Sequence, residues 1–168
     1  QEKQVKMRVT IQPKGASKQV RGKKSDKKIA TDNKSGVVTG KKLDKTKITV
    51  NAKGNKKVKA TKTIKVMAPV KSVSISGKGV VGSKHTASVL PKDAKVKFKW
   101  YYVENGKRVA IKGATKSTYT PNATEAGKII QLGVSGTNYH KGTKYSKAVT
   151  VVNKNDAYVK QIDDQYVI

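Results

Sequence analysis

The chain has 168 residues, enough for one ordinary domain or two small ones, and it contains no cysteine. Its 38 Lys and Arg residues against 10 Asp and Glu residues give a formal net charge of +28. The lack of cysteine excludes disulfides and thiolate metal sites. So large a charge predicts contact with polyanions, which means nucleic acid, acidic lipid surfaces or the anionic polymers of a cell wall or capsule.

The periodic segments all alternate apolar and polar residues with period two, as strands with one buried face do. No window shows a helical stripe, and no apolar run approaches the ~20 residues that a membrane span needs. Many short strands without helices predict an all-β fold built from β-sandwiches. The predicted strands, in chain order, are 4–11, 19–21, 28–31, 36–39, 46–51, 57–67, 71–76, 84–90, 95–103, 107–111, 117–120, 128–135 and 145–152.

The strongest hairpin pattern is KVKFKWYYVENGKRVAIKG, residues 95 to 113. Successive strand residues point to opposite faces, so the even positions from 96 to 102 form an apolar face. Asn105–Gly106 has the residues that a two-residue type I′ turn requires. Folding about this turn places Tyr102 opposite Val109 and Trp100 opposite Ile111. The outer face then carries Lys95, Lys97, Lys99, Tyr101, Arg108 and Lys112, the candidate polyanion-binding residues.

Two interpretations of these lysines remain open. A half-buried antiparallel strand must show one polar face to water, and lysine also protects strand edges from unwanted pairing. Alternatively, lysines two apart on a strand lie about 7 Å from each other, inside a Debye length of ~8 Å, and their repulsion predicts a bound counter-ion. Tyr101, within the row of lysines, could add a stacking face for a sugar ring.

Residues 25–42 read SDKKIATDNKSGVVTGKK, and residues 46–66 read TKITVNAKGNKKVKATKTIKV. Together they resemble the group 2 bacterial immunoglobulin-like repeat of the invasin and intimin type, over most of residues 5–66. The resemblance implies a first sandwich at 1–68. It also implies an opening strand ahead of Gln1, so the sequence is interpreted as a processed product or a fragment.

Residues 71–152 contain KFKWYY, IKGATKSTYTPNATEAGK and Leu132 with Val134. They resemble a second bacterial immunoglobulin-like type, found in tandem on Gram-positive surface proteins, in which Trp100 and Tyr119 match core aromatics. The two resemblances imply two tandem immunoglobulin-like sandwiches, without catalysis, in a bacterial surface protein or a virion appendage.

The residues that could take part in catalysis or metal binding are scattered along the sequence. The ten carboxylates are scattered, and the adjacent pair Asp163–Asp164 would point to opposite faces of a strand. His85 shares the apolar face of a strand and is expected to be packed and hydrogen-bonded, whereas His140 is expected in a solvated loop. We therefore predict no enzyme, no cofactor and no metal site.

The segment 153–168 is the C-terminal tail, and residues 151–168 carry 2 basic and 3 acidic side chains, unlike the basic remainder. It either leads into a linker or adds a strand to a sandwich, within the chain or by self-association with a neighbouring chain.

The expected function is a non-enzymatic, extracellular or cell-surface module that spaces, adheres or binds anionic envelope polymers such as teichoic acid or acidic polysaccharide. The alternative is a structural subunit or decoration of a virion or an extracellular filament. Nucleic-acid binding is the weaker alternative, because residues 1–97 contain no aromatic side chain on which a base could stack.

Overall fold

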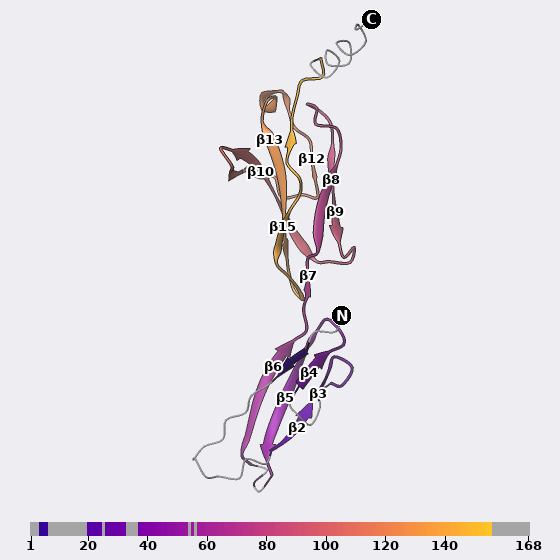
Figure 1. Ribbon diagram of the computed structural model, residues 1–168, viewed down its shortest axis with the longest axis vertical. Helices are drawn as coiled ribbons and strands as arrows, with labels where there is room; N and C mark the ends of the chain where they lie inside the picture. Colours follow the sequence, from indigo (N-terminus) through magenta and orange to yellow (C-terminus); the bar gives the residue numbers. More distant parts are fainter. Residues whose placement is uncertain are drawn as a thin grey trace, which may run out of the picture. The chain divides into compact units, whose positions relative to one another are not determined.

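The computed structural model describes residues 4–6, 20–24, 26–32, 37–53, 55 and 57–155. The chain divides into two compact units, Gln1–Ala68 and Pro69–Ile168. Apart from one short 3-10 helix, η1 (Ala123–Glu125), every regular element in the described ranges is a strand (Figure 1). The predicted all-β class is therefore confirmed, while the prediction for the tail lies mostly in residues 156–168, outside the described residues.

The first unit contains two antiparallel sheets with the strand orders β1-β4-β3 and β2-β5-β6. Ala30 and Val38 of one sheet and Ile48 of the other form its buried cluster, so the two sheets pack as a sandwich. No aromatic side chain takes part in this cluster. The strands are β1 (Gln4–Lys6), β2 (Val20–Lys24), β3 (Ala30–Asp32), β4 (Val37–Gly40), β5 (Lys45–Ala52) and β6 (Lys59–Lys65).

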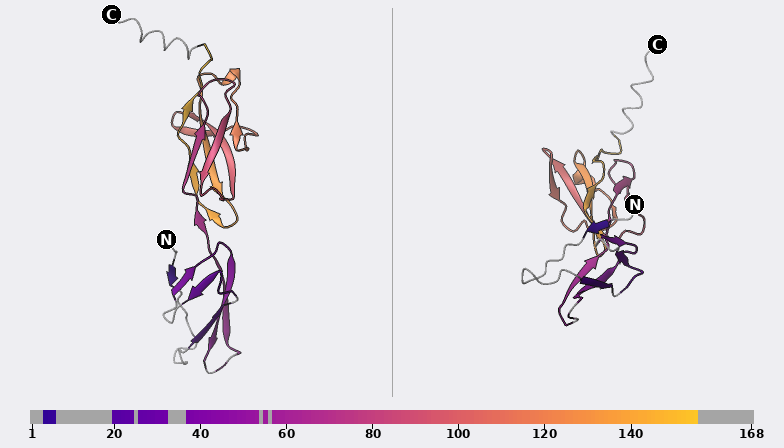
Figure 2. Two further views of the ribbon diagram at one scale, coloured as in Figure 1. Left: turned by 90° about the vertical axis from the view of Figure 1, so that its right-hand side faces the viewer. Right: turned by 60° about the horizontal axis from the view of Figure 1, so that its bottom comes forward.

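The second unit contains one sheet with the order β12-β9-β8 and another with the order β11-β10-β13-β15, in which β16 also pairs with β13 (Figures 1 and 2). A further pair joins β14 to β7, the short strand that leads into this unit. The strands are β7 (Ala68–Pro69), β8 (Ser72–Ser76), β9 (His85–Leu90), β10 (Val96–Glu104), β11 (Lys107–Ala110), β12 (Thr118–Tyr119), β13 (Ile129–Gly136), β14 (His140–Lys141), β15 (Thr143–Tyr145) and β16 (Val149–Thr150).

These strand orders correspond to the two sheets of an immunoglobulin-like sandwich. The strand β10 occupies the place of the immunoglobulin strand that carries a buried tryptophan, and Trp100 on β10 is 0% exposed. Trp100 stacks on Tyr119, with 5.3 Å between the ring centroids, and its indole N–H donates to the Lys116 carbonyl at 3.0 Å. The hydrophobic cluster of this unit contains Trp100 and Leu132, and Phe98, Ile111 and Tyr119 pack against it.

The β10–β11 hairpin confirms the predicted turn and register. Asn105 and Gly106 both have positive φ angles, 49° and 74°, and Tyr102 lies opposite Val109. The strand β11 ends at Ala110, but the Ile111 N–H still donates to the Trp100 carbonyl at 2.9 Å. Val109 lies on the same side of the sheet as Tyr102, but it remains 46% exposed because β11 is the edge strand of its sheet.

The strand predicted at 145–152 is wrong in extent, because the structure has two short strands there, β15 and β16. Ser146 causes the interruption. Its buried hydroxyl accepts a hydrogen bond from the Leu132 N–H at 3.1 Å and donates to the Lys147 carbonyl at 2.8 Å. A side chain thereby replaces a backbone partner, and the regular ladder between β13 and the last strand stops. The strand β14 was not predicted.

Candidate polyanion-binding surface

The solvent-facing side of the sheet β11-β10-β13-β15 is called the outer face here. Its members alternate with the core residues of the same strands, because side chains in a strand point to opposite sides. Lys97 and Lys99 on β10 are exposed, whereas Trp100 between Lys99 and Tyr101 is buried. From the pairing registers, the outer face consists of Lys97, Lys99, Tyr101, Val103, Arg108, Ala110, Gln131, Gly133, Ser135, Thr143 and Tyr145.

The Arg108 side chain extends from the edge strand β11 across β10 and contacts side chains of β13 and β15 on the same face of the sheet. Its Nε donates to Gln131 Oε1 on β13 at 2.6 Å, and its guanidinium carbon lies 3.7 Å from the centroid of the Tyr145 ring on β15. Gln131 is itself held, since its Nε2 donates to the Ser146 carbonyl at 2.7 Å. A cation–π contact and a hydrogen bond thus fix the orientation of an exposed guanidinium.

Tyr101 and Tyr145 converge over Gly133 in the middle of the outer face. The two rings meet edge to face, with 6.0 Å between centroids and 64° between planes. A Cβ at position 133 would lie 2.8 Å from Tyr101 Cε2 and 2.9 Å from Tyr145 Cε1, so only glycine lets both rings lie this close to the sheet. Lys99 Nζ lies 5.8 Å from the Tyr101 centroid, which adds a cation beside the aromatic pair.

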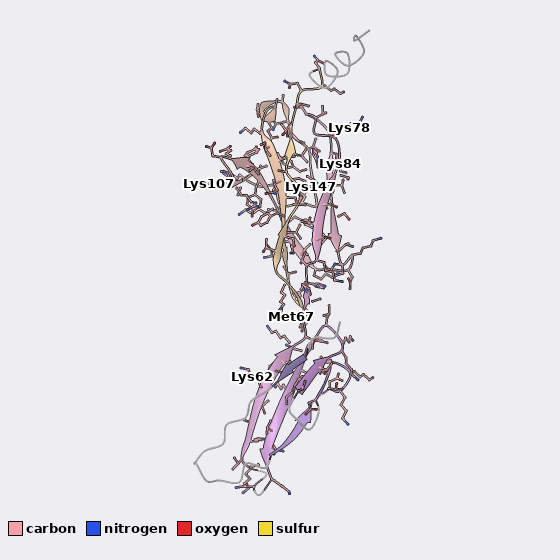
Figure 3. The ribbon with its side chains drawn as sticks, in the orientation of Figure 1. Lys62, Met67, Lys78, Lys84, Lys107 and Lys147 are labelled. Carbon is pink, nitrogen blue, oxygen red and sulfur yellow. The ribbon has the colours of Figure 1, made fainter. Side chains whose placement is uncertain are left out.

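The structure brings four of the six predicted residues together on the outer face, namely Lys97, Lys99, Tyr101 and Arg108. Lys95 precedes β10, and its backbone N–H donates to His140 Nδ1 at 3.3 Å. Lys112 lies past the end of β11 and lines a separate hollow of about 530 Å³. Its expected place on the outer face is therefore wrong, because the strand ends before the alternation reaches it. Other lysines of the surface, such as Lys62, Lys84 and Lys107, are also exposed (Figure 3).

Glu125 lies among the lining residues of that hollow and is only 2% exposed. Its Oε1 accepts hydrogen bonds from the hydroxyls of Tyr102 and Tyr119, and its Oε2 accepts one from the Asn122 N–H at 2.7 Å. Burial alone would raise the pKa of Glu125, but these three donors and the charge of Lys128 outweigh it and hold the pKa below its ordinary value.

Burial and the Glu125 hydrogen bond raise the pKa of both phenols, Tyr102 and Tyr119, so the protons stay on the tyrosines. Glu125 is therefore an ionised acceptor that ties η1 to β10 and β12. Catalysis by paired carboxylates would need a second acid or base beside it. Within the described part of the chain, no three His, Asp or Glu side chains gather closely enough to hold a metal ion.

The two histidines differ from their predicted environments. His85 is buried as predicted, 6.3 Å from the Trp100 ring centroid, but neither ring nitrogen has a hydrogen-bond partner in the described structure. Burial lowers the pKa of His85, and the nearby backbone of Ser76 opposes this shift only in part. His140 lies on β14 and is only 6% exposed, so the prediction that it lies in a solvated loop is wrong. Tertiary packing buries its side chain although the surrounding sequence is polar.

The predicted surface did not include Gln131, Gly133 or Tyr145. Gln131 and Gly133 do share the alternation of a strand that the sequence predicted, which was the available signal. Their convergence with Arg108 depends on strand order, and local patterns do not encode which strands become neighbours.

No protein-family model and no curated protein matches the sequence. Murine CEACAM1b is similar in structure at 15% identity, with a TM-score of 0.43, over 74% of this chain and 68% of that one. The Yersinia pseudotuberculosis adhesin InvE is similar at 17% identity, with a TM-score of 0.31, over 81% of this chain. The match spans about half of InvE, 49% of its chain. Similarity at this level assigns neither a partner nor an activity to this chain.

Proposed function

We propose that this chain is a non-catalytic adhesion module of a surface protein, and that it binds the anionic polymers of a cell envelope. The module consists of two small β-sandwiches, and the second sandwich presents the outer face to the polymer. No helix among the described residues is long and apolar enough to cross a membrane.

The observation that carries the proposal is the one-sided charge of the outer face. Lys97, Lys99 and Arg108 are exposed there, and none of the outer-face residues is acidic. Ordinary protein surfaces intersperse both signs, because like charges within a Debye length repel one another and destabilise the compact state. A polyanion lying along the sheet would replace this repulsion by attraction.

The charge of the whole chain favours the same class of ligand. Residues 1–70 carry 21 basic and 4 acidic side chains, and residues 71–150 carry 15 and 3. A field of one sign over so much of the sequence accelerates encounter with a polyanion and makes affinity depend steeply on salt. Binding should therefore be broad, with the outer face as its strongest part.

Retention of the whole chain on immobilised polyanions tests the proposal. Retention on poly(glycerol phosphate) and on polygalacturonate should exceed retention on neutral dextran and fall steeply as NaCl rises. The triple substitution Lys97→Gln, Lys99→Gln and Arg108→Gln, which removes the exposed cations of the outer face, should weaken retention partly.

The matched control replaces three exposed lysines outside the outer face, Lys71, Lys84 and Lys92, by glutamine. It removes the same charge and should weaken retention less than the first triple. Equal retention of the unsubstituted chain on dextran and on both polyanions would overturn the proposal.

A further inference from the structure

Arg108 is exposed and yet held in a fixed orientation, which distinguishes it from the lysines around it. A surface lysine is a mobile point charge that attracts any anion, whereas a guanidinium held in one plane can select the shape of the anion. Arg108 has two restraints, the Gln131 hydrogen bond at Nε and the Tyr145 ring against its plane.

These restraints leave the two terminal nitrogens of Arg108 available. Nε is the only Arg108 nitrogen that bonds to a described residue. A guanidinium can donate two parallel hydrogen bonds from its side, through Nε and one terminal nitrogen, or from its end, through Nη1 and Nη2. Because Nε of Arg108 already donates to Gln131, only the end-on fork made by Nη1 and Nη2 can bind an anion. A planar carboxylate matches such a fork with two parallel hydrogen bonds, each strengthened by charge.

The surroundings of Arg108 suit a ring that carries the carboxylate. Tyr145 is 41% exposed although Arg108 stacks on it, and Tyr101 is half-buried beside it. Both tyrosine rings pack close to the backbone at Gly133. The surface between Arg108 and Lys99 is therefore aromatic, and it has a cation on either side. A sugar ring packs on aromatic side chains through its C–H groups, while an acyclic phosphate polymer offers no such ring.

We propose that Arg108, Tyr101 and Tyr145 form a subsite for a uronate, a sugar ring bearing a carboxylate, within an acidic polysaccharide. The carboxylate pairs with the end-on fork of Arg108, and the ring lies against the two tyrosines. Lys97 and Lys99 hold the neighbouring charged units of the polymer. This subsite rests on the proposed function, because it names the class of polymer that the outer face prefers.

Two short ligands with three anionic groups each, and a neutral one for comparison, test the subsite without the effect of polymer length. Trigalacturonate, tri(glycerol phosphate) and neutral maltotriose are titrated into the whole chain, and amide shifts in NMR spectra give each affinity. Trigalacturonate should bind more tightly than tri(glycerol phosphate) at equal salt, and maltotriose should bind least.

Three substitutions distinguish the contribution of the two terminal N–H donors of Arg108 from the contribution of its positive charge. Arg108→Lys keeps the charge but removes the fork, and it should weaken trigalacturonate binding about five- to tenfold while leaving tri(glycerol phosphate) nearly unchanged. Gly133→Ala changes no charge but pushes the two tyrosine rings away, and it should have the same selective effect. Lys107→Arg, at the exposed first position of β11, is the control and should leave both affinities as they are.

Two failures are distinguishable. If the chain binds both trianions equally and Arg108→Lys changes neither affinity, the subsite is refuted while polyanion binding stands. If neither trianion binds better than maltotriose and the polymers are not retained either, the proposed function fails as well. Amide signals that keep the dispersion of a folded chain in Arg108→Lys and Gly133→Ala show that a loss of binding is not a loss of folding.

Discussion

Replacing Glu125 by glutamine should destabilise the second sandwich at neutral pH. The carboxylate is 2% exposed, and its two oxygens accept from Tyr102, Tyr119 and the Asn122 N–H. Glutamine has one oxygen. If that oxygen faces the tyrosines, the amide NH₂ faces the Asn122 N–H, and two donors oppose each other.

The expected loss is about 2 kcal/mol in the free energy of unfolding. A hydrogen bond to a charged group contributes roughly 1.5–3 kcal/mol, and the substitution removes one such bond outright and leaves the other two with a neutral acceptor. The neutral glutamine does not have the desolvation cost of the buried carboxylate charge. This gain offsets part of the loss and keeps the net destabilisation near the lower end of that range. With a urea slope of about 1 kcal/mol/M for a unit of this size, the midpoint should fall by about 2 M.

Tryptophan fluorescence in urea measures this unit within the whole chain. Trp100 is the single tryptophan and is 0% exposed in the second core, so its emission reports the second sandwich alone. Glu104→Gln is the matched control, because Glu104 is exposed at the end of β10 and its loss changes the net charge equally. The midpoint of this control should stay close to that of the unsubstituted chain.

The pH dependence follows from the lowered pKa of Glu125 in the folded chain. A carboxyl whose folded pKa lies below its unfolded value of about 4.3 stabilises the fold above that value, and the contribution is lost as pH falls through the folded pKa. The gap between the unsubstituted chain and Glu125→Gln should therefore be full at pH 6–7 and narrow below about pH 4. Equal midpoints at pH 7, or a gap that does not change with pH, would refute this account of Glu125.

Two other substitutions test the cores. His85→Leu removes two buried ring nitrogens that have no partner in the described structure, and it should stabilise the second sandwich by about 1 kcal/mol. Because the folded pKa of His85 is lowered, the unsubstituted chain should also lose stability as pH falls from about 6.5 to about 5, where Glu125 is still ionised, and His85→Leu should not. A variant that is no more stable, or equally sensitive to pH in this range, contradicts this. Gly40→Ala places a Cβ 2.7 Å from Val66 Cγ1 and should destabilise the first sandwich by about 1–3 kcal/mol, measured by far-ultraviolet circular dichroism in urea. Adding Val66→Ala should cost less in the Gly40→Ala chain than in the unsubstituted chain, and strictly additive losses would refute the overlap.

The β10–β11 hairpin shows how far local sequence determines this fold. Alternation fixed the face of each residue, and Asn105–Gly106 fixed the register that pairs Tyr102 with Val109. The same alternation correctly placed Trp100 in the core and Lys99 in solvent. Both inferences need only neighbouring residues and the geometry of a strand.

The rest of the candidate surface depends on contacts between distant residues. Arg108 and Gln131 are 23 positions apart, and they meet because β11, β10 and β13 are neighbours in that order. His140 lies in a polar segment that reads as a loop, yet packing around β14 buries it. Neither the order of strands nor the burial of a turn follows from periodicity, since both depend on tertiary packing.

An amide NMR titration of the whole chain with polygalacturonate locates the polymer on the molecule, and it therefore tests whether the outer face is the binding surface. We expect the largest shifts on β10, β13 and β15 around Lys99, Gly133 and Tyr145, and we expect them to disappear in about 0.5 M NaCl, where the Debye length is only about 4 Å. If the largest shifts fall on the sheet β12-β9-β8, or if no shifts occur at low salt, the outer face is not the binding surface.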